Sequence, residues 1–105
     1  MKDLLIGIDK LIEEELVRAN GKFSLFHSEH EGVAVIEEEI MEANDDFVMM
    51  TERFKGFKSG VYHDETEFSA HNVSMVKKSA KHAAAELLQV CAMCDKFMTS
   101  KEERK

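Results

Sequence analysis

Apolar residues recur along this chain at the spacing of an α-helix, in three separate stretches. The first covers about residues 3–20, where they follow the i, i+3, i+4, i+7 rule at Leu4, Leu5, Ile8, Leu11, Ile12 and Leu16. Asn20-Gly21 then marks the end of the helix, because glycine readily adopts the left-handed conformation that closes helices. Residues 22–28 form a connector with two aromatic side chains, Phe23 and Phe26.

The second stretch opens at Ser28. Glu31 follows three residues later, and this spacing predicts a capping box at the start of a helix. We expect this helix to run into the 50s, with Gly56 and Gly60 bracketing its end. Its apolar stripe is predicted at Val33, Ile36, Ile40 and Phe47.

The third stretch opens near Asp64, with Glu67 as a second capping candidate, and runs to about Thr99. We expect residues 100–105 to be frayed. The apolar stripe has near-heptad spacing, at Val73, Val76, Ala80, Ala83, Leu87, Cys91, Cys94 and Met98.

These patterns predict an all-α chain, since proline is absent and glycine is too sparse for the turns that strands need. We expect one domain over residues 1–105, a helical bundle with two long antiparallel helices plus an N-terminal helix. The third apolar stripe is longer than the first two helices can cover. The bundle is therefore expected to be completed by dimerisation.

Charge and hydropathy exclude two classes of partner. The net charge of -7 argues against a binder of nucleic acid polymers, which would need a basic surface. No apolar run approaches the roughly 20 residues that span a bilayer, so no membrane partner is expected. The first residues have too short an apolar core for a signal peptide, and we expect a cytoplasmic protein.

Glu38, Glu39 and Glu42 form the pattern E-E-x-x-E within the second helix. Acids three or four residues apart share a helix face and repel each other, unless a cation lies among them. Mg²⁺ prefers carboxylate oxygens, and Mn²⁺ can substitute for it, so one interpretation is a metal site that holds a polyphosphate. A solvated acidic face is the alternative. The similar run of residues 13–15 is expected to be such a face, because Glu14 can pair with Arg18.

Glu86 and Gln89 place a carboxylate and an amide on one face of the third helix. A carboxylate in so apolar a run is costly to bury unless it is paired or metal-bound, although the face could simply be exposed. His30 and Glu31 at the start of the second helix could touch a base or sugar, or only cap the helix.

Two further pairs have a chemical and a structural interpretation. Phe23 and Phe26 could stack on a base, with core packing as the favoured alternative. Cys91 and Cys94 could form a redox pair or half a zinc site, but we favour buried reduced thiols, because no second cysteine pair exists.

Two segments resemble the motif helices of MazG-like all-α nucleoside triphosphate pyrophosphohydrolases, and most closely the short phage and bacterial type. The first is Ser28-Glu-His-Glu-Gly-Val-Ala-Val-Ile-Glu-Glu-Glu-Ile-Met-Glu-Ala43, which is similar to S-x-H-E-G-x-A-V-I-x-E-E-x-x-E. The second is Glu86-Leu-Leu-Gln-Val-Cys-Ala-Met-Cys-Asp-Lys-Phe97. The resemblance covers roughly residues 20–50 and 80–97. It implies a dimer or dimer of dimers that uses Mg²⁺ to convert a nucleoside triphosphate to the monophosphate and pyrophosphate.

The resemblance also implies roles for residues. Glu38, Glu39, Glu42 and Glu86 match the metal ligands, and the Glu38/Glu39 pair would orient or deprotonate the attacking water. Gln89 stands where the family usually has aspartate, and Lys96 matches a basic position suited to the phosphates. Because Gln89 carries no charge, a catalytically weak nucleotide-binding protein, such as a phage sponge or regulator, is the first alternative. A helical protein-interaction module is the second.

Overall fold

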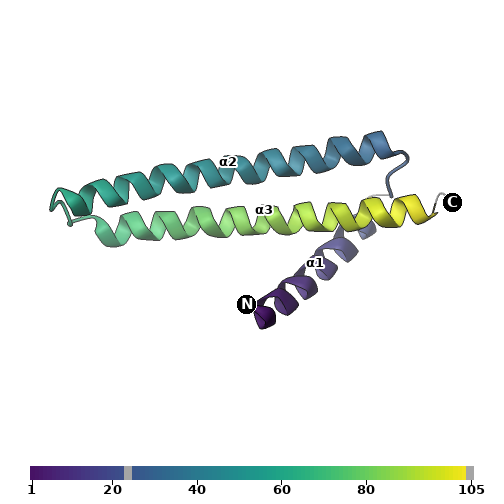
Figure 1. The fold of residues 1–105 in the computed structure, drawn as a ribbon, viewed down its shortest axis with the longest axis horizontal. Helices are drawn as coiled ribbons and strands as arrows, with labels where there is room; N and C mark the ends of the chain where they lie inside the picture. Colours follow the sequence, from purple (N-terminus) through teal and green to yellow (C-terminus); the bar gives the residue numbers. More distant parts are fainter. Residues whose placement is uncertain (23–24, 104–105) are drawn as a thin grey trace. The chain divides into compact units, whose positions relative to one another are not determined.

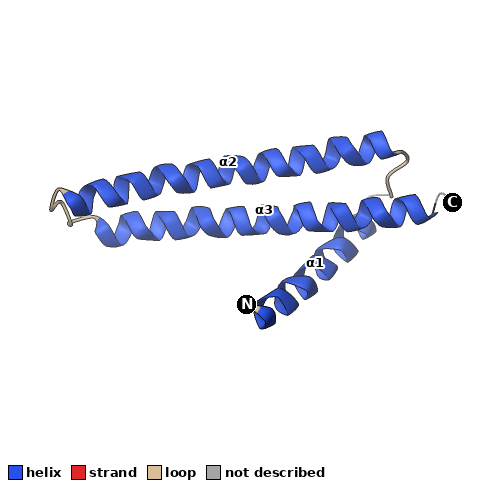
Figure 2. Ribbon diagram, viewed as in Figure 1, coloured by secondary structure: helices blue, strands red, loops and turns tan. Residues whose placement is uncertain are grey.

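The computed structural model describes residues 1–22 and 25–103, and within this part of the chain all regular structure is helical (Figure 2). The helices are α1 (Lys2–Lys22), α2 (Glu29–Tyr62) and α3 (Ser69–Glu103) (Figure 1). The prediction of an all-α chain with a short first helix and two long ones is confirmed. Within the described ranges, no helix is both long and apolar enough to cross a membrane.

The chain divides into two compact units. The first unit combines Met1–Ile40 with Glu86–Lys105, and the second consists of Met41–Ala85. Both α2 and α3 contribute to each unit. That the whole chain is one domain stays a prediction.

The core of the first unit joins α1, the connector and the C-terminal part of α3. Its buried members are Ala19, Phe26, Ala92 and Met93. Partly buried apolar side chains pack against them, namely Leu16, Val35, Ile36 and Phe97. Alanines in this core let the helices approach closely, while Phe26 and Met93 supply most of the apolar volume. Phe23 lies outside the described residues.

Ser100 ties the end of α3 to the connector. Its hydroxyl accepts a hydrogen bond of 2.9 Å from the backbone N–H of Phe26 and donates one of 2.8 Å to the carbonyl of Lys96. One residue on, Lys101 forms an ion pair of 3.1 Å with Glu29. The helix thus remains ordered to Glu103, further than the frayed tail that we expected from residue 100. The reason is tertiary, because Ser100 is buried at this contact.

The predicted cap of α2 is present. The N–H of Glu31 donates to Ser28 Oγ at 3.1 Å, as a capping box requires. The return bond differs from that pattern, because Glu31 Oε2 accepts from the N–H of His27 at 3.3 Å rather than from Ser28. The side chain of Glu31 therefore stabilises the helix start, which favours the capping role over ligand contact alone.

Gly32 is the closest approach of α2 to α3 within the first unit. A Cβ atom at this position would collide with the ring of Phe97 and lie 3.3 Å from the ring of Phe26. We expect Gly32→Ala to lower the free energy of unfolding by about 1–3 kcal/mol, since overpacking forces both rings to move. Gly56→Ala on the same helix is the control. A Cβ atom there meets nothing within 4 Å, so alanine should stabilise the helix by up to about 1 kcal/mol. Urea unfolding of both variants measures the difference, and equal effects would contradict the close contact.

The second unit is a hairpin of the remaining parts of α2 and α3. Arg53 on α2 donates hydrogen bonds to Ser79 Oγ at 2.7 Å and to the carbonyl of Met75 at 3.3 Å, both on α3. These bonds link residues far apart along the chain and fix which faces of the two segments meet. Ser79 is buried by this contact.

Both predicted helix ends at this hairpin are wrong. Helix α2 continues past Gly56 and Gly60 to Tyr62, and α3 begins at Ser69 rather than near Asp64. Asp64 has a φ of 57° and serves the end of α2 instead of capping α3. The N–H of Asp64 donates to the carbonyl of Val61 at 3.1 Å, and the next N–H donates to Gly60 at 2.7 Å, which is the Schellman pattern.

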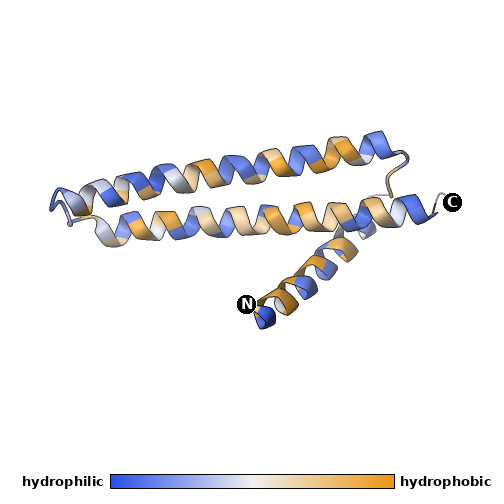
Figure 3. Ribbon diagram, viewed as in Figure 1, coloured by the Kyte–Doolittle hydropathy of each residue, from blue (hydrophilic) through white to orange (hydrophobic). Residues whose placement is uncertain are grey.

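Much of the predicted apolar stripe of α2 faces solvent within the single chain. Val33, Ile40 and Phe47 are each more than half exposed. The face of α2 that packs inward contains small or polar residues instead, including Gly32, Glu39 and Ala43. Apolar residues also recur along α1 (Figure 3), and several are exposed: Leu4, Leu5, Ile6 and Leu11. On α3 the same holds for Val73, Leu87 and Met98.

Candidate functional site

Glu39 on α2 and Glu86 on α3 bring two carboxylates together within the first unit. Each offers an oxygen, and the two oxygens lie within 4.8 Å of each other. Both side chains are half-buried, although each residue lies in a helix that is otherwise amphipathic. The pairing across two helices is what the sequence pattern predicted for these two residues.

Glu42 follows Glu39 by one helical turn and offers an oxygen within the same 4.8 Å of it. Glu38 is exposed and does not belong to this group of ligand atoms. The physical reason is helical geometry, because successive residues are rotated by about 100° and cannot both face the same neighbour. The structure therefore brings together three of the four predicted acids and leaves Glu38 at the surface.

The spacing of these oxygens fits a hard divalent cation. Mg²⁺ binds oxygens at about 2.1 Å in octahedral geometry, so its ligand atoms lie about 3 to 4.2 Å apart. Oxygens within 4.8 Å reach that range with small rotations of the side chains. Carboxylates are also the ligand type that Mg²⁺ and Mn²⁺ prefer, so the donor set fits the implied metal.

A cavity of about 460 Å³ adjoins this cluster and shares Glu39 with it. Its walls come from α1, the connector, α2 and α3, all within the first unit. The volume is in the range of small-molecule sites. The polar lining residues are Arg18, Glu31, Glu39, Gln89 and Lys96. The apolar ones are Ala19, Phe26, Val35 and Met93.

Lys96 supplies a cation inside this cavity. The residue is only 3% exposed, and its ammonium lies 4.9 Å from the centre of the Phe26 ring. An aromatic face stabilises a cation at this distance. The ring of Phe26 thus belongs both to the core and to the cavity wall, so the two interpretations of this residue are compatible.

Gln89 lies on the cavity wall and is held from α1. Its Nε2 donates a hydrogen bond of 2.6 Å to Glu15 Oε1. Glu15 also forms an ion pair with Arg18. The hydrogen bond from Glu15, followed by its charge, raises the pKa of the Arg18 guanidinium, so Arg18 remains cationic at the cavity.

Two expectations about neighbouring residues change. Arg18 pairs with Glu15 rather than with Glu14 as predicted. His30 is exposed and is not among the residues that line the cavity, whereas Glu31 is. A contact between His30 and a nucleotide stays a prediction.

Sequence reasoning missed Glu15 because it treated the first acidic run as surface decoration. A signal was present, since Glu15 stands three residues after Ile12 and seven after Ile8, on the apolar face of its helix. Glu39 shows the same feature, four residues after Val35 and three after Ile36. A carboxylate on the apolar face of a helix is therefore the better indicator of a site than a run of acids.

The two cysteines are free and exposed, which corrects the expectation of buried thiols. They line a separate hollow of the first unit, together with Asp9, Glu13 and Asp95. Burial raises the pKa of the Cys91 thiol, and the neighbouring Cys94 and carboxylates raise it further. A thiol held in its protonated form is a poor nucleophile and a poor zinc ligand, which disfavours both the redox pair and the zinc half-site.

We expect Cys91 to react slowly with iodoacetamide at neutral pH. The thiolate is the reactive form, and a raised pKa moves its formation to higher pH. In a Cys94→Ser variant, where Cys91 is the only cysteine left, the alkylation rate should reach half its maximum above the pH of an ordinary thiol. Mass spectrometry over a pH series measures this. A midpoint below that of a free cysteine peptide would contradict the repulsive environment.

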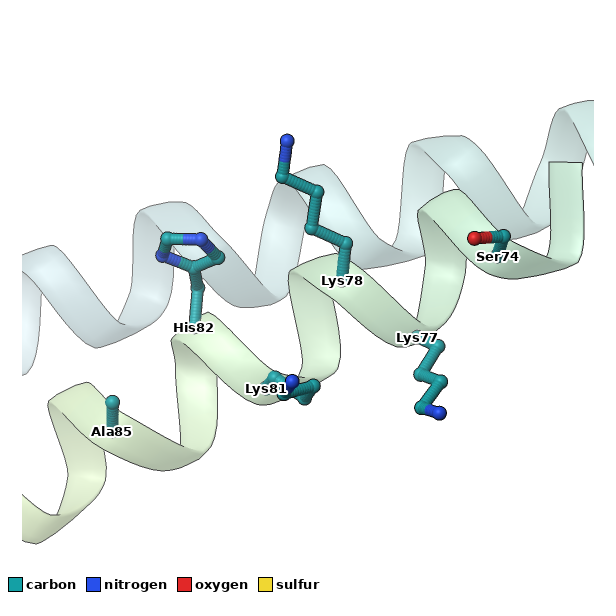
Figure 4. A pocket seen from close by; sticks show the side chains of 6 residues that line it. All are labelled: Ser74, Lys77, Lys78, Lys81, His82 and Ala85. Atoms are coloured by element: carbon teal, nitrogen blue, oxygen red, sulfur yellow. The ribbon is translucent and has the colours of Figure 1, made fainter. Parts of the chain in front are cut away.

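A second hollow of about 560 Å³ lies on α3 within the second unit, and three lysines contribute to it. Figure 4 shows that Lys77, Lys78 and Lys81 extend from the helix in different directions rather than toward one point. All of its lining residues come from this one helix: Ser74, Lys77, Lys78, Lys81, His82 and Ala85. This basic segment is a solvated face, and it contains no carboxylate to hold a metal ion.

The arrangement in the first unit can therefore bind a divalent cation beside a cavity that presents cations and an aromatic ring. Comparisons of the chain with models of protein families, with curated proteins and with solved structures found no match. Membership of the MazG-like family consequently stays a prediction that rests on the two motif segments.

Proposed function

We propose that this protein is a Mg²⁺-dependent nucleotide pyrophosphohydrolase that converts a nucleoside triphosphate or a related nucleotide to the monophosphate and pyrophosphate. The observation that carries the proposal is the position of Glu39, which belongs both to the carboxylate group and to the cavity wall. A metal ion and the phosphates of a nucleotide would then occupy adjoining positions. The resemblance of residues 28–43 and 86–97 to MazG-like motif helices supports the same reaction.

Glu39, Glu42 and Glu86 would hold the ion, with Gln89 as a neutral fourth ligand. Mg²⁺ would supply charge neutralisation at the phosphates and a lowered pKa of a coordinated water. Lys96 and Arg18 would bind phosphate oxygens from the other side of the cavity, and the Phe26 ring would pack on the ligand. A carboxylate of the Glu38/Glu39 pair would accept the proton of the water that attacks the α-phosphorus, and pyrophosphate would leave.

The experiment is a panel of ribo- and deoxyribonucleoside triphosphates incubated with the protein and Mg²⁺, with release of pyrophosphate as the readout. The expected result is pyrophosphate and the monophosphate in equal amounts, and no release when EDTA is present. Release of inorganic phosphate alone would place the cleavage at another bond and would contradict the proposal.

Gln89 favours one alternative, a nucleotide-binding protein with little catalysis. Its amide brings no charge where the resembled family has a carboxylate, so metal affinity and turnover could both be lower. Calorimetry with the same nucleotides separates the two: binding without pyrophosphate release indicates the weak binder, as in a phage sponge. Neither binding nor release would leave a helical interaction module, for which the exposed apolar residues provide a surface.

We further propose that two copies associate, as a dimer or a dimer of dimers. Apolar side chains that are about half exposed or more recur on all three helices, for example Leu4, Phe47 and Leu87. Isolated exposed apolar residues are ordinary, but a recurrent set on long helices is typical of surfaces that a partner covers. We expect sedimentation equilibrium at micromolar concentration to give at least twice the mass of the 12.0 kDa chain. A monomer under these conditions would contradict the prediction.

A further inference from the structure

Glu15, on α1, holds the amide of Gln89 from outside the cavity. The hydrogen bond from Gln89 Nε2 to Glu15 Oε1 is 2.6 Å long and connects residues 74 positions apart along the chain. Gln89 is one of the residues that line the cavity, whereas Glu15 is not. The nitrogen end of the amide is thus directed toward α1 rather than into the cavity.

The chemistry of the two side chains fixes which end of the amide faces α1. An ionised carboxylate only accepts hydrogen bonds, so Gln89 has to present its NH₂ group to Glu15. The amide is planar, with oxygen and nitrogen on different sides of its carbon atom. Its Oε1 is therefore turned away from Glu15. Because Gln89 follows Glu86 by one helical turn, the two side chains share one face of α3.

We propose that Glu15 is a positioning residue that aims the carbonyl oxygen of Gln89 at a divalent cation held by Glu39 and Glu86. This inference rests on the proposed function, because it takes the carboxylate group to be a metal site. It assigns a role to the acidic run of α1, outside both segments that resemble the MazG-like motifs. Outer partners that orient metal ligands in this way commonly affect metal affinity strongly.

The inference also explains how a neutral residue can serve at position 89. The negative charge that an aspartate would bring is present one hydrogen bond further out, on Glu15. A carboxylate that accepts from the NH₂ group polarises the amide and makes its oxygen a better ligand. Conversely, Gln89→Glu alone would place two carboxylates at hydrogen-bond distance, where they repel.

The test is titration of the protein with Mn²⁺ and with Mg²⁺ by calorimetry, without nucleotide, for wild type and three variants. Glu15→Gln keeps the size of the side chain and can still pair with Gln89, but in either orientation of both amides. We expect this variant to bind the cation about tenfold or more weakly. Glu14→Gln is the matched control, since it removes the same charge from an exposed neighbour on the same helix and should bind within about twofold of wild type.

The exchanged pair Glu15→Gln with Gln89→Glu tests positioning against a merely structural role. It restores a hydrogen bond with donor and acceptor reversed and presents a carboxylate oxygen to the cation, so affinity should return to the wild-type value or exceed it. The ion pair of Arg18 remains weakened in this double variant, so recovery also shows that Arg18 is not the cause. In NMR spectra of the metal-free protein, the side-chain NH₂ resonances of Gln89 should shift in Glu15→Gln and not in Glu14→Gln.

The outcomes separate this inference from the proposed function. Wild-type affinity in Glu15→Gln overturns the positioning role while leaving the metal site and the enzyme intact. Equal losses in Glu14→Gln and Glu15→Gln also overturn it, because they indicate a general effect of charge. A wild-type protein that binds neither cation overturns the metal site and this inference together, and unshifted NH₂ resonances in Glu15→Gln overturn the hydrogen bond itself.

Discussion

Replacing Glu39 by glutamine is expected to abolish both the metal-induced rise in melting temperature and the release of pyrophosphate. Glu39 is the acid that the carboxylate group and the cavity share, so its loss removes a ligand and a group beside the phosphates. At a hundredfold excess of Mg²⁺ over its dissociation constant, binding stabilises the native state by about 2.7 kcal/mol, and this increment should disappear. We expect turnover to fall by about a hundredfold or more.

Glu37→Gln provides the control for this prediction. Glu37 is exposed on the same helix, and its substitution changes the net charge by the same amount. It should retain the thermal shift and the turnover of wild type. Differential scanning fluorimetry with and without Mg²⁺, together with a pyrophosphate assay, measures both quantities. A Glu39→Gln variant that keeps the full shift would show that the metal binds elsewhere.

Lys96→Met is expected to weaken nucleotide binding by about ten- to a hundredfold while leaving binding of Mg²⁺ alone unchanged. Lys96 is buried to 3% exposure and lines the cavity, so its ammonium would form a charge-assisted hydrogen bond to phosphate. Such bonds contribute about 1.5–3 kcal/mol, which corresponds to this loss. Methionine keeps the unbranched stem of lysine, so the packing beside Phe26 should survive.

Lys101→Met is the matched control, because Lys101 lies on the same helix but pairs with Glu29 at the surface. It should bind nucleotide as wild type does, since surface ion pairs contribute little. Calorimetry with a nucleoside triphosphate and Mg²⁺ compares the two variants. Equal affinities would place the phosphates outside the cavity. A loss of Mg²⁺ binding in Lys96→Met would instead indicate damage to the fold.

Local chemistry predicted several features well. The capping residue Ser28 and its partner Glu31 lie a fixed distance apart in sequence, so the start of α2 could be located before the structure. The helical spacing of apolar residues predicted three helices and their approximate lengths. Glu86 stood out because a lone acid in an apolar run needs a partner, and the structure places it beside Glu39.

Other features depended on which face of each helix meets its neighbour. Glu38 and Glu39 are equivalent as letters in a motif, but only Glu39 lies on the face of α2 that carries Gly32 and Ala43. The close approach at Gly32, which the apolar pattern did not predict, places α2 against Phe97 of α3. Asp64 was expected to begin a helix, yet its left-handed conformation is used to end the preceding one.

The sequence by itself determined that this chain is helical, where α2 begins and which acids are candidates for a metal site, because these properties depend on residues within a few turns of one another. Only the tertiary structure decided that Glu39 rather than Glu38 meets Glu86, and that Glu15 of the first acidic run holds Gln89. Both outcomes follow from the rotation of one helix against another. That rotation is set by packing between residues far apart in the chain, so a periodic pattern along one helix does not contain it.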